Sequence, residues 1–202
     1  MGMQRLYRDA AGASAAEFAL VLPLLLLVLF GTIDVGRYAW SLSQAEKATQ
    51  TGARWAVATD MIASGLYSYS FAISGGIPQG TVVPAASFPT ITCQSTGAVA
   101  CACPGNLSFC STASTAAFTG LVARMAQIYP GLTADNVVVT YSWSGLGFSG
   151  DPNGPDVAPL TTVSLRNVRF APFSSQIFGG RVDLPQFAYT LPMEDGSGTS
   201  SN

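Results

Sequence analysis

The feature that most constrains this chain is an apolar stretch from Ala10 to Ile33 in which Glu17 is the one ionisable residue. A helix of that length covers roughly 36 Å at ~1.5 Å per residue, enough to cross a bilayer core of ~30 Å. Pro23 lies within the stretch, and we expect it to kink the helix or to sit where local hydrogen bonds are made good. The stretch therefore predicts a single membrane-spanning helix.

The charges on either side of this stretch predict its orientation. Arg5 and Arg8 precede it, whereas Asp34 and Arg37 follow it. The positive-inside tendency counts lysine and arginine, and it places the leader in the cytoplasm. We therefore expect a cytoplasmic leader and an exported remainder.

The helix is expected to continue beyond the membrane, because residues 34–62 contain no proline. Small or apolar residues recur there at a spacing of three or four, which marks one helix face. This stripe consists of Val35, Tyr38, Leu42, Ala45, Thr49, Gly52, Ala56 and Thr59. Gln44, Lys47 and Arg54 lie off the stripe, and Lys47 is interpreted as a solvated position. The pattern predicts one helix of about 50 residues, half in lipid and half packed on a protein core.

The rest of the chain carries signals for both helix and strand. Residues 65–89 are rich in glycine, serine and proline and are expected to form a loop. Residues 111–131 predict a second helix that ends at Pro130-Gly131. Its expected apolar face consists of Phe118, Leu121, Val122, Met125 and Ile128.

Three strands are expected, at residues 136–143, 161–173 and 180–194, because these segments are β-branched, aromatic or alternating. Pro185 places the last strand at a sheet edge or a bulge. The predicted fold class is α+β. A long N-terminal helix, first transmembrane and then amphipathic, packs on a small antiparallel sheet of about three to four strands. A second helix and a disulfide-stapled loop complete the fold.

The four cysteines, Cys93, Cys101, Cys103 and Cys110, lie in one short segment behind the membrane stretch. Their even number and export to an oxidising compartment predict disulfides. A zinc site with four thiolates is the alternative, but Cys-x-Cys lacks the usual ligand spacing. Cys101 and Cys103 are poorly placed to bond each other, so two pairings remain. The turn-like STG and PGN segments favour Cys93–Cys101 with Cys103–Cys110.

Composition argues against several classes of function. Histidine is absent, which removes the commonest general base and metal ligand. The net charge of −2 provides no basic field for nucleic acid. DPNGPD (151–156) offers oxygen ligands for calcium, but its glycine is fourth rather than sixth, and a surface turn is the preferred interpretation. No Gly-x-Ser-x-Gly elbow is present.

Glu17 needs a separate explanation. A carboxylate inside a bilayer costs of order 3 kcal/mol, so such groups usually have a role and a partner. The alternative is that Glu17 lies at headgroup depth, where the cost is small.

The order of these features resembles a known family. The sequence GASAAEFALVLPLLLLVLFGTIDVGRYAW, followed by QAEKATQTGARWAV, resembles the TadE-like minor pilins of bacterial tight-adherence (Tad) pili. The resemblance runs from Gly12 to about Val57. It combines a glycine, four small residues, Glu17-Phe18, the leucine-rich run, Asp-x-Gly-Arg and Gly-Ala-Arg. The segments 163–173 and 182–194 resemble the closing strands of the family less specifically.

The resemblance implies processing by a membrane prepilin peptidase after Gly12. Ala13 would become the new N-terminus, and Glu17 would become the fifth residue of the mature chain. The amine of Ala13 would then be paired by Glu17 of a neighbouring subunit. Phe18, where the fibre-forming pilin usually has tyrosine, and the long globular part both indicate a minor subunit.

We therefore expect a minor pilin, or pseudopilin, that helps to initiate, cap or assemble an adhesive fibre. Its expected partners are other pilus subunits, the Tad assembly machinery, the prepilin peptidase and the inner membrane, without a cofactor, nucleic acid or enzymatic activity. The alternatives are a permanently anchored, uncleaved periplasmic interaction protein and a membrane-anchored periplasmic hydrolase. The expected segments are a cytoplasmic leader (1–12), a transmembrane helix (13–34), its periplasmic continuation (35–64), a periplasmic α+β domain (65–194) with a Cys-rich loop (93–110), and a disordered tail (195–202).

Overall fold

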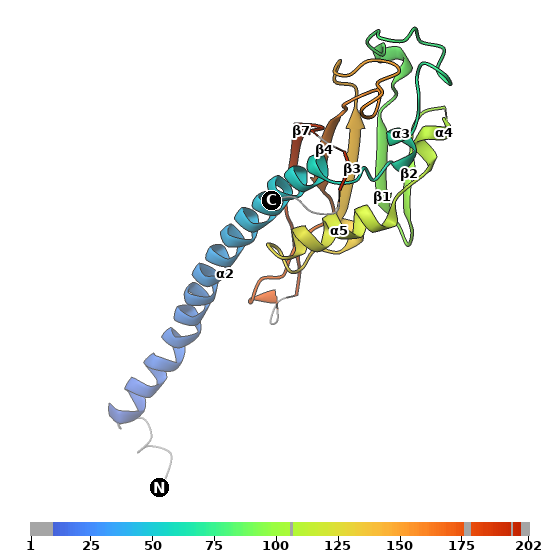
Figure 1. Ribbon diagram of the computed structural model, residues 1–202. Coiled ribbons are helices and arrows are strands. Elements are labelled where there is room, and N and C mark those ends of the chain that lie inside the picture. Colours follow the sequence, from blue (N-terminus) through green and yellow to red (C-terminus); the bar gives the residue numbers. More distant parts are fainter. Residues whose placement is uncertain (1–9, 106, 176–178, 195, 199–202) are drawn as a thin grey trace. The chain divides into compact units, whose positions relative to one another are not determined.

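The structure is a computed structural model that describes residues 10–105, 107–175, 179–194 and 196–198 (Figure 1). The chain divides into two compact units. The helical unit consists of Met1–Ser41 and Arg169–Val182, and the globular unit consists of Leu42–Val168 and Asp183–Asn202. Helix α2 (Ala10–Ala58) contributes residues to both units.

Helix α2 is continuous over 49 residues and contains Pro23. Its end at Ala58 differs from the expected end of the helical segment at residue 64. Beyond Ala58, backbone N–H groups donate to residues that are distant in the sequence. Asp60 N donates to Gly198 O at 2.8 Å, and Ile62 N donates to the Tyr141 hydroxyl at 3.0 Å. Tertiary hydrogen bonds therefore replace the next helical turn.

The outer half of α2 buries the stripe of small residues that the sequence predicts. Ala45, Thr49, Gly52, Ala56 and Thr59 are all buried, and Lys47 is exposed as expected. The stripe begins later than predicted, because Val35 is exposed and both Tyr38 and Leu42 are only half-buried. The part of α2 that packs on the globular core therefore starts near Ala45.

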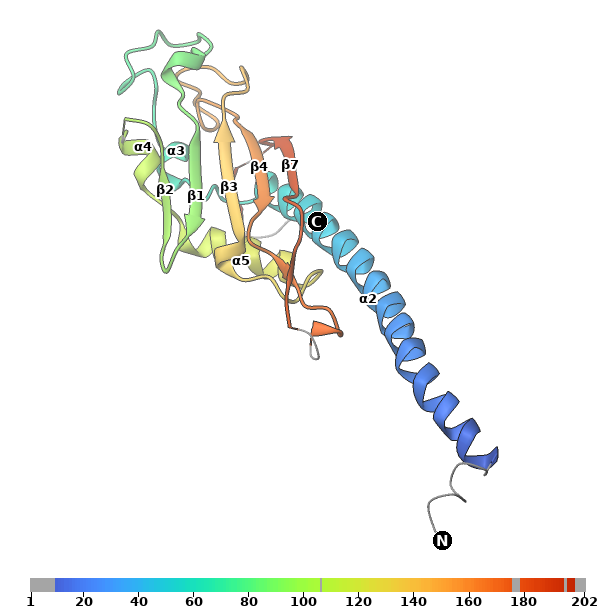
Figure 2. The ribbon, with the colours of Figure 1, turned by 180° about the vertical axis from the view of Figure 1, so that it is seen from behind.

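Five strands form an antiparallel sheet, one more than the upper limit of the prediction. The strands are β1 (Ile91–Ser95), β2 (Val99–Ala102), β3 (Val137–Ser142), β4 (Leu160–Leu165) and β7 (Ala188–Pro192), in the order β2-β1-β3-β4-β7 (Figure 2). The first two were missed because they lie in the segment expected to be a Cys-rich loop. Alternate residues of β1 are buried, and cysteine and serine occupy positions where an apolar strand signal is usually sought.

A separate two-stranded ribbon consists of β5 (Arg169–Phe170) and β6 (Val182–Asp183). The predicted strand at 161–173 therefore breaks into β4 and β5. The break falls near Asn167, whose φ of 53° is left-handed and ends an extended strand. The predicted strand at 180–194 likewise divides into β6 and β7, and β7 forms an edge of the main sheet, as Pro185 predicted.

The described helices after α2 are short. They are α3 (Ser64–Tyr67), η1 (Ala85–Ser87), α4 (Ser108–Ser111), α5 (Thr115–Ala126) and η2 (Ala134–Asn136). Helix α5 is the predicted second helix, and the Ser114 hydroxyl caps it by accepting from Ala117 N at 3.2 Å. Its residues Phe118, Leu121 and Met125 are buried as predicted, whereas Val122 is half-buried, as is Ile128 beyond the end of the helix.

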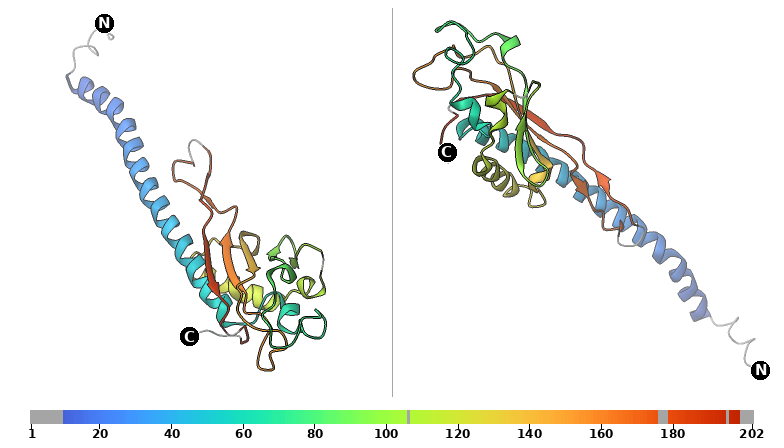
Figure 3. Two further views of the ribbon diagram at one scale, coloured as in Figure 1. Left: turned by 90° about the horizontal axis from the view of Figure 1, so that it is seen from above. Right: turned by 90° about the vertical axis from the view of Figure 1, so that its right-hand side faces the viewer.

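The core of the globular unit lies between one face of the sheet and the helices α5 and α2 (Figure 3). Strand β3 contributes Val137, Val139 and Tyr141, all fully buried. A Cβ added at Gly52 would lie 2.7 Å from the sulfur of Met125, so α2 and α5 approach closely at this glycine. The α+β fold class, with its long helix, antiparallel sheet and two disulfides, is confirmed.

The expected disordered tail is only partly described, since Asp195 and residues 199–202 lie outside the described residues. Residues 196–198 are described, and the disordered tail stays a prediction. Gly198 N donates to Asp60 Oδ1 at 2.7 Å, and Gly196 is buried beside Met61. Glycine permits this close backbone approach, which the composition of the tail alone does not indicate.

Candidate functional site

The inner half of α2 exposes large apolar side chains along its length. Phe18, Leu20, Leu24, Leu25 and Val28 are all more than half exposed. Only 6% of the most apolar 18-residue window of the helix is buried within the protein. Soluble monomers rarely leave an apolar surface of this size uncovered. By length and composition, this half of α2 is a candidate membrane span.

The predicted processing and assembly residues lie at the start of this helix. Gly12 and Ala13 belong to α2, and Glu17 and Phe18 are exposed on it one turn later. No described residue forms an ion pair or a hydrogen bond with the Glu17 carboxylate. The structure thus brings the four residues onto one short helical segment.

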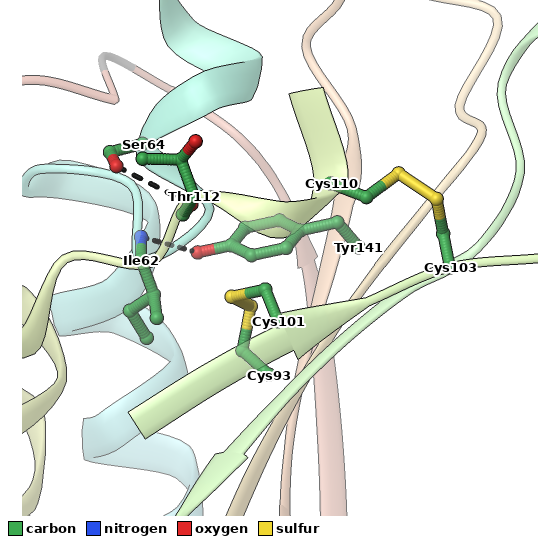
Figure 4. The surroundings of a disulfide bond; sticks show 8 residues. All are labelled: Ile62, Ser64, Cys93, Cys101, Cys103, Cys110, Thr112 and Tyr141. Atoms are coloured by element: carbon green, nitrogen blue, oxygen red, sulfur yellow. Dashed lines mark hydrogen bonds between the residues drawn. A yellow bond between two sulfur atoms is a disulfide. The ribbon is translucent and has the colours of Figure 1, made fainter. Parts of the chain in front are cut away.

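The four predicted cysteines form two disulfides in the globular unit (Figure 4). Cys93 and Cys101 are directly opposed on β1 and β2, with their Cα atoms 4.0 Å apart. Cys103 bonds Cys110, which joins the segment after β2 to helix α4. This pairing is the one that the two turn-like segments favour. All four cysteines are oxidised, so the bonds hold the hairpin and α4 together as one covalent unit.

Tyr141 connects this stapled region to the end of α2. Its hydroxyl accepts the N–H of Ile62, and in Figure 4 the side chain points from β3 toward that residue. The residue is fully buried, and this desolvation raises the pKa of the Tyr141 phenol to about 12, although the backbone hydrogen bonds oppose the shift. The buried, neutral phenol of Tyr141 thus forms a hydrogen bond with Ile62, which lies 79 positions away in the sequence.

Asp34 is the functional candidate that sequence reasoning missed. Its carboxylate accepts the backbone N–H groups of both Phe173 and Ser174, the second at 2.9 Å. Arg37 lies one turn along α2, with its guanidinium 3.7 Å from the same carboxylate. Although polar, Asp34 is buried. The residue therefore fastens the turn after β5 to α2, across 139 positions of sequence.

Aromatic contacts extend this attachment on both sides of Asp34. The rings of Phe30 and Phe173 lie 5.4 Å apart, and those of Tyr38 and Phe170 lie 5.6 Å apart. The guanidinium of Arg37 lies 5.4 Å from the centre of the Phe170 ring. The Asp-x-Gly-Arg pattern at 34–37 was the available signal, since it places an acid and a base one helical turn apart.

The possible calcium loop at 151–156 serves another purpose in the structure. Asp156 is buried, and its two oxygens accept backbone N–H groups, from Phe71 at 2.6 Å and from Asp151 at 3.1 Å. Asp151 accepts in turn from Asn153 N at 2.9 Å. Within the described ranges, no group of three or more acidic, cysteine or histidine side chains is arranged to hold a metal ion. The carboxylates instead join this loop to the segment around Phe71.

Comparison with known proteins identifies the N-terminal part of the chain. Residues 12–54 match the family model described as TadE-like protein, which confirms the resemblance seen in the sequence. Neither the search of curated proteins nor that of solved structures gave a match. The matched segment contains the candidate membrane span, Glu17 and the Asp34–Arg37 pair. The segment 12–54 is therefore similar to TadE-like proteins.

Proposed function

We propose that this protein is a minor pilin, or pseudopilin, of a Tad-type pilus and that it helps to initiate, cap or assemble the fibre. The observation that carries the proposal is the TadE-like match over residues 12–54, which coincides with an apolar helix whose side chains are left uncovered. A surface of this kind can be covered by lipid before assembly and by neighbouring helices within a fibre. The proposed role is structural rather than catalytic, and the absence of histidine from the sequence supports it.

The proposed processing step is cleavage between Gly12 and Ala13 by a prepilin peptidase. Cleavage creates a cationic amine at Ala13, four residues before Glu17. A lone charge in apolar surroundings is costly, whereas a paired amine and carboxylate cost much less. Glu17 is exposed and lies in the first turn of the mature helix, where the helix dipole favours an anion. We infer that Glu17 pairs with the amine of a neighbouring subunit and sets the axial register.

The proposed location is the bacterial inner membrane, with the N-terminus in the cytoplasm and the globular unit in the periplasm. Arg5 and Arg8 support this orientation, as do two disulfides in the segment beyond the span. In this arrangement the peptidase meets the leader, while other pilus subunits and the assembly machinery meet the helix and the exported domain.

Intact-mass measurement with and without the cognate peptidase tests the processing step. The mass should fall by that of residues 1–12 when the peptidase is present. An unchanged mass would instead favour the permanently anchored alternative.

A substitution at Glu17 tests the assembly step separately from folding. Glu17→Ala should leave the disulfides and the protease resistance of the globular unit intact, but reduce co-purification with other pilus subunits. Loss of one partner from a buried ion pair costs roughly 3–5 kcal/mol, so the reduction should be severe. Glu46→Ala is the matched control, because Glu46 is also exposed on α2 but lies beyond the apolar stretch. Normal piliation by the Glu17→Ala variant would show that the pairing mechanism is wrong.

A further inference from the structure

We propose that the turn after β5, Pro172–Ser175, together with Val182 of β6, forms a second membrane contact that rests in the lipid interface beside the end of the span. This surface is called the interfacial turn below. The proposal rests on the membrane-anchoring part of the proposed function and adds a lipid-binding role for a segment far from the span in sequence.

The depth of the interfacial turn follows from its contact with α2. The Phe173 ring lies 5.4 Å from that of Phe30, a residue inside the apolar stretch. Phe30 precedes Asp34 by four residues, which corresponds to ~6 Å along the helix axis. Phe173 therefore reaches back past Asp34 to the level of the last turn of the span. The Phe173 side chain is 51% exposed, so the contact with Phe30 covers only part of the ring.

The backbone of the interfacial turn is prepared for an environment poor in water. Non-helical backbone at membrane depth is costly because its N–H groups lack partners. Here the N–H groups of Phe173 and Ser174 are taken by Asp34, and that of Ser175 donates to Pro172 O at 3.1 Å. Pro172 has no N–H to satisfy. Every backbone donor from Pro172 to Ser175 thus has an acceptor within the helical unit.

The side chains around the turn match the gradient from hydrocarbon to headgroups. Ile33, Val35 and Val182 are exposed apolar residues that continue the surface of the span. Trp40 is 67% exposed on the next turns of α2, and tryptophan is enriched where hydrocarbon meets headgroups. The guanidinium of Arg37 lies over the Phe170 ring, and half of the Arg37 side chain is exposed and can meet headgroups.

A shallow groove of about 250 Å³ lies within this surface. It is lined mainly by apolar groups, those of Val35, Tyr38, Phe170, Pro172 and Val182. The groove is continuous with the exposed face of the span, and this continuity favours a phospholipid as its occupant over a soluble protein partner. The interfacial turn would thereby oppose vertical movement of α2 in the bilayer, since sinking or rising would displace Phe173 from the interface.

Depth-dependent quenching in vesicles tests the proposal with the full chain. The protein is reconstituted into phosphatidylethanolamine–phosphatidylglycerol vesicles and labelled with an environment-sensitive fluorophore at one introduced cysteine. The four native cysteines are in disulfides and do not compete when no reductant is added. Phe173→Cys and Val182→Cys report on the interfacial turn, and Ile33→Cys reports on the span. Lipids with a nitroxide on the headgroup, or at a shallow or deep chain position, act as quenchers.

The label at position 173 should lose most of its emission to headgroup and shallow-chain quenchers, and the label at position 182 to headgroup quenchers. The label at position 33 should be quenched by chain nitroxides. Adding Asp34→Ala should reduce quenching at position 173 and leave that at position 33 unchanged, because the turn is then released from the helix. If Phe173→Cys weakens the contact with Phe30, the label at position 182 decides the outcome.

Three outcomes would overturn the proposal. Quenching at position 33 but at neither 173 nor 182 would show that the protein is anchored while the turn remains in water. A blue-shifted emission at position 173 without lipid quenching would show that the turn binds protein instead. Lack of quenching at all three positions would refute the membrane anchor itself, and with it the proposed function.

Discussion

The two halves of helix α2 differ in the size of their apolar residues, and the outer half also carries charged ones. From Phe18 to Ile33 the helix carries large side chains that remain exposed. From Ala45 to Val57 it carries small residues that are buried, among them Ala48 and Ala53 at 0% exposure. The apolar side chains of the first half are largely uncovered, whereas the small residues of the second half are covered by the rest of the globular unit.

The difference in side-chain size determines what each half can pack against. Small residues let two backbones approach, as the position of Met125 over Gly52 shows, and they cannot bury much area by themselves. Large residues present area to a deformable partner such as lipid, where close approach of backbones is not needed. The globular unit should therefore lose stability when its own contacts are altered, whereas the inner half of α2 should respond to its environment.

Reduction of both disulfides should have the largest effect of the changes considered. It should unfold the globular unit and leave the inner half of α2 helical. Each bond closes a loop of seven or eight positions, for which chain entropy gives about 2.5 kcal/mol per bond. The sum, about 5 kcal/mol, matches the whole stability of many domains. In vesicles, reductant should abolish the near-ultraviolet circular dichroism of the globular unit while helical signal from the span persists. Loss of both signals together would show that the two halves are one cooperative unit.

Gly52→Leu tests the packing of small residues in the outer half. The new side chain would collide with Met125, and overpacking of this kind costs typically 1–3 kcal/mol. The gain in helix propensity opposes this by ~1 kcal/mol, so we expect a net loss of about 1 kcal/mol in urea denaturation. Gly36→Leu is the matched control, because nothing lies within 4 Å of a Cβ at that glycine. Equal effects of the two substitutions would contradict the comparison.

Tyr141→Phe tests the tie between β3 and the end of α2. The variant leaves the buried N–H of Ile62 without its acceptor, which should cost about 1–2 kcal/mol at neutral pH. Chemical denaturation of the globular unit measures this loss. Tyr67→Phe, at an exposed tyrosine, is the control and should have little effect.

The same substitution predicts a difference in alkaline stability. Burial raises the pKa of Tyr141 to about 12 in the folded state, against about 10 in the unfolded state. Below pH ~10 the phenol is protonated in both states and its contribution is constant. Between these values only the unfolded state releases the proton, so stability should fall by about 1.4 kcal/mol per pH unit. Tyr141→Phe should lack this part of the decline; an identical decline in both proteins would refute the assignment.

Asp34→Ala should have the smallest effect on the globular unit and a local effect on the helical unit. We expect a change within about 0.5 kcal/mol in urea denaturation, since the hydrogen bonds and the ion pair of Asp34 with described residues lie within the helical unit. The freed amides of Phe173 and Ser174 should exchange faster with solvent, and trypsin should cleave more readily after Arg181. Asp34→Asn retains one acceptor and should be intermediate. Unchanged exchange at both amides would show that Asp34 does not hold the turn.

Local patterns in the sequence predicted the elements that depend on local physics. The apolar stretch, the small-residue stripe from Ala45 onward, helix α5 and strand β3 all follow from periodicity over short windows. The preferred disulfide pairing also follows from short turns between neighbouring cysteines. The TadE-like resemblance was accessible for the same reason, since it lies within one continuous segment, residues 12–54.

The β1–β2 hairpin and the positions of Asp34 and Asp156 were decided by tertiary structure. The buried face of the hairpin consists in part of Cys93, Ser95 and Cys101. These residue types do not indicate a strand in the sequence, and they become buried only because the hairpin pairs with the rest of the sheet. Asp34 and Asp156 looked like a helix-end charge and a surface turn, because their partners lie 139 and 85 positions away. A carboxylate accepts any correctly placed N–H group, so its role depends on which backbone the fold brings within hydrogen-bonding distance. The sequence alone determined that a long apolar helix would continue into a small α+β domain. Tertiary structure decided which acids hold the loops of that domain, because contacts between distant segments leave no periodic trace in the chain.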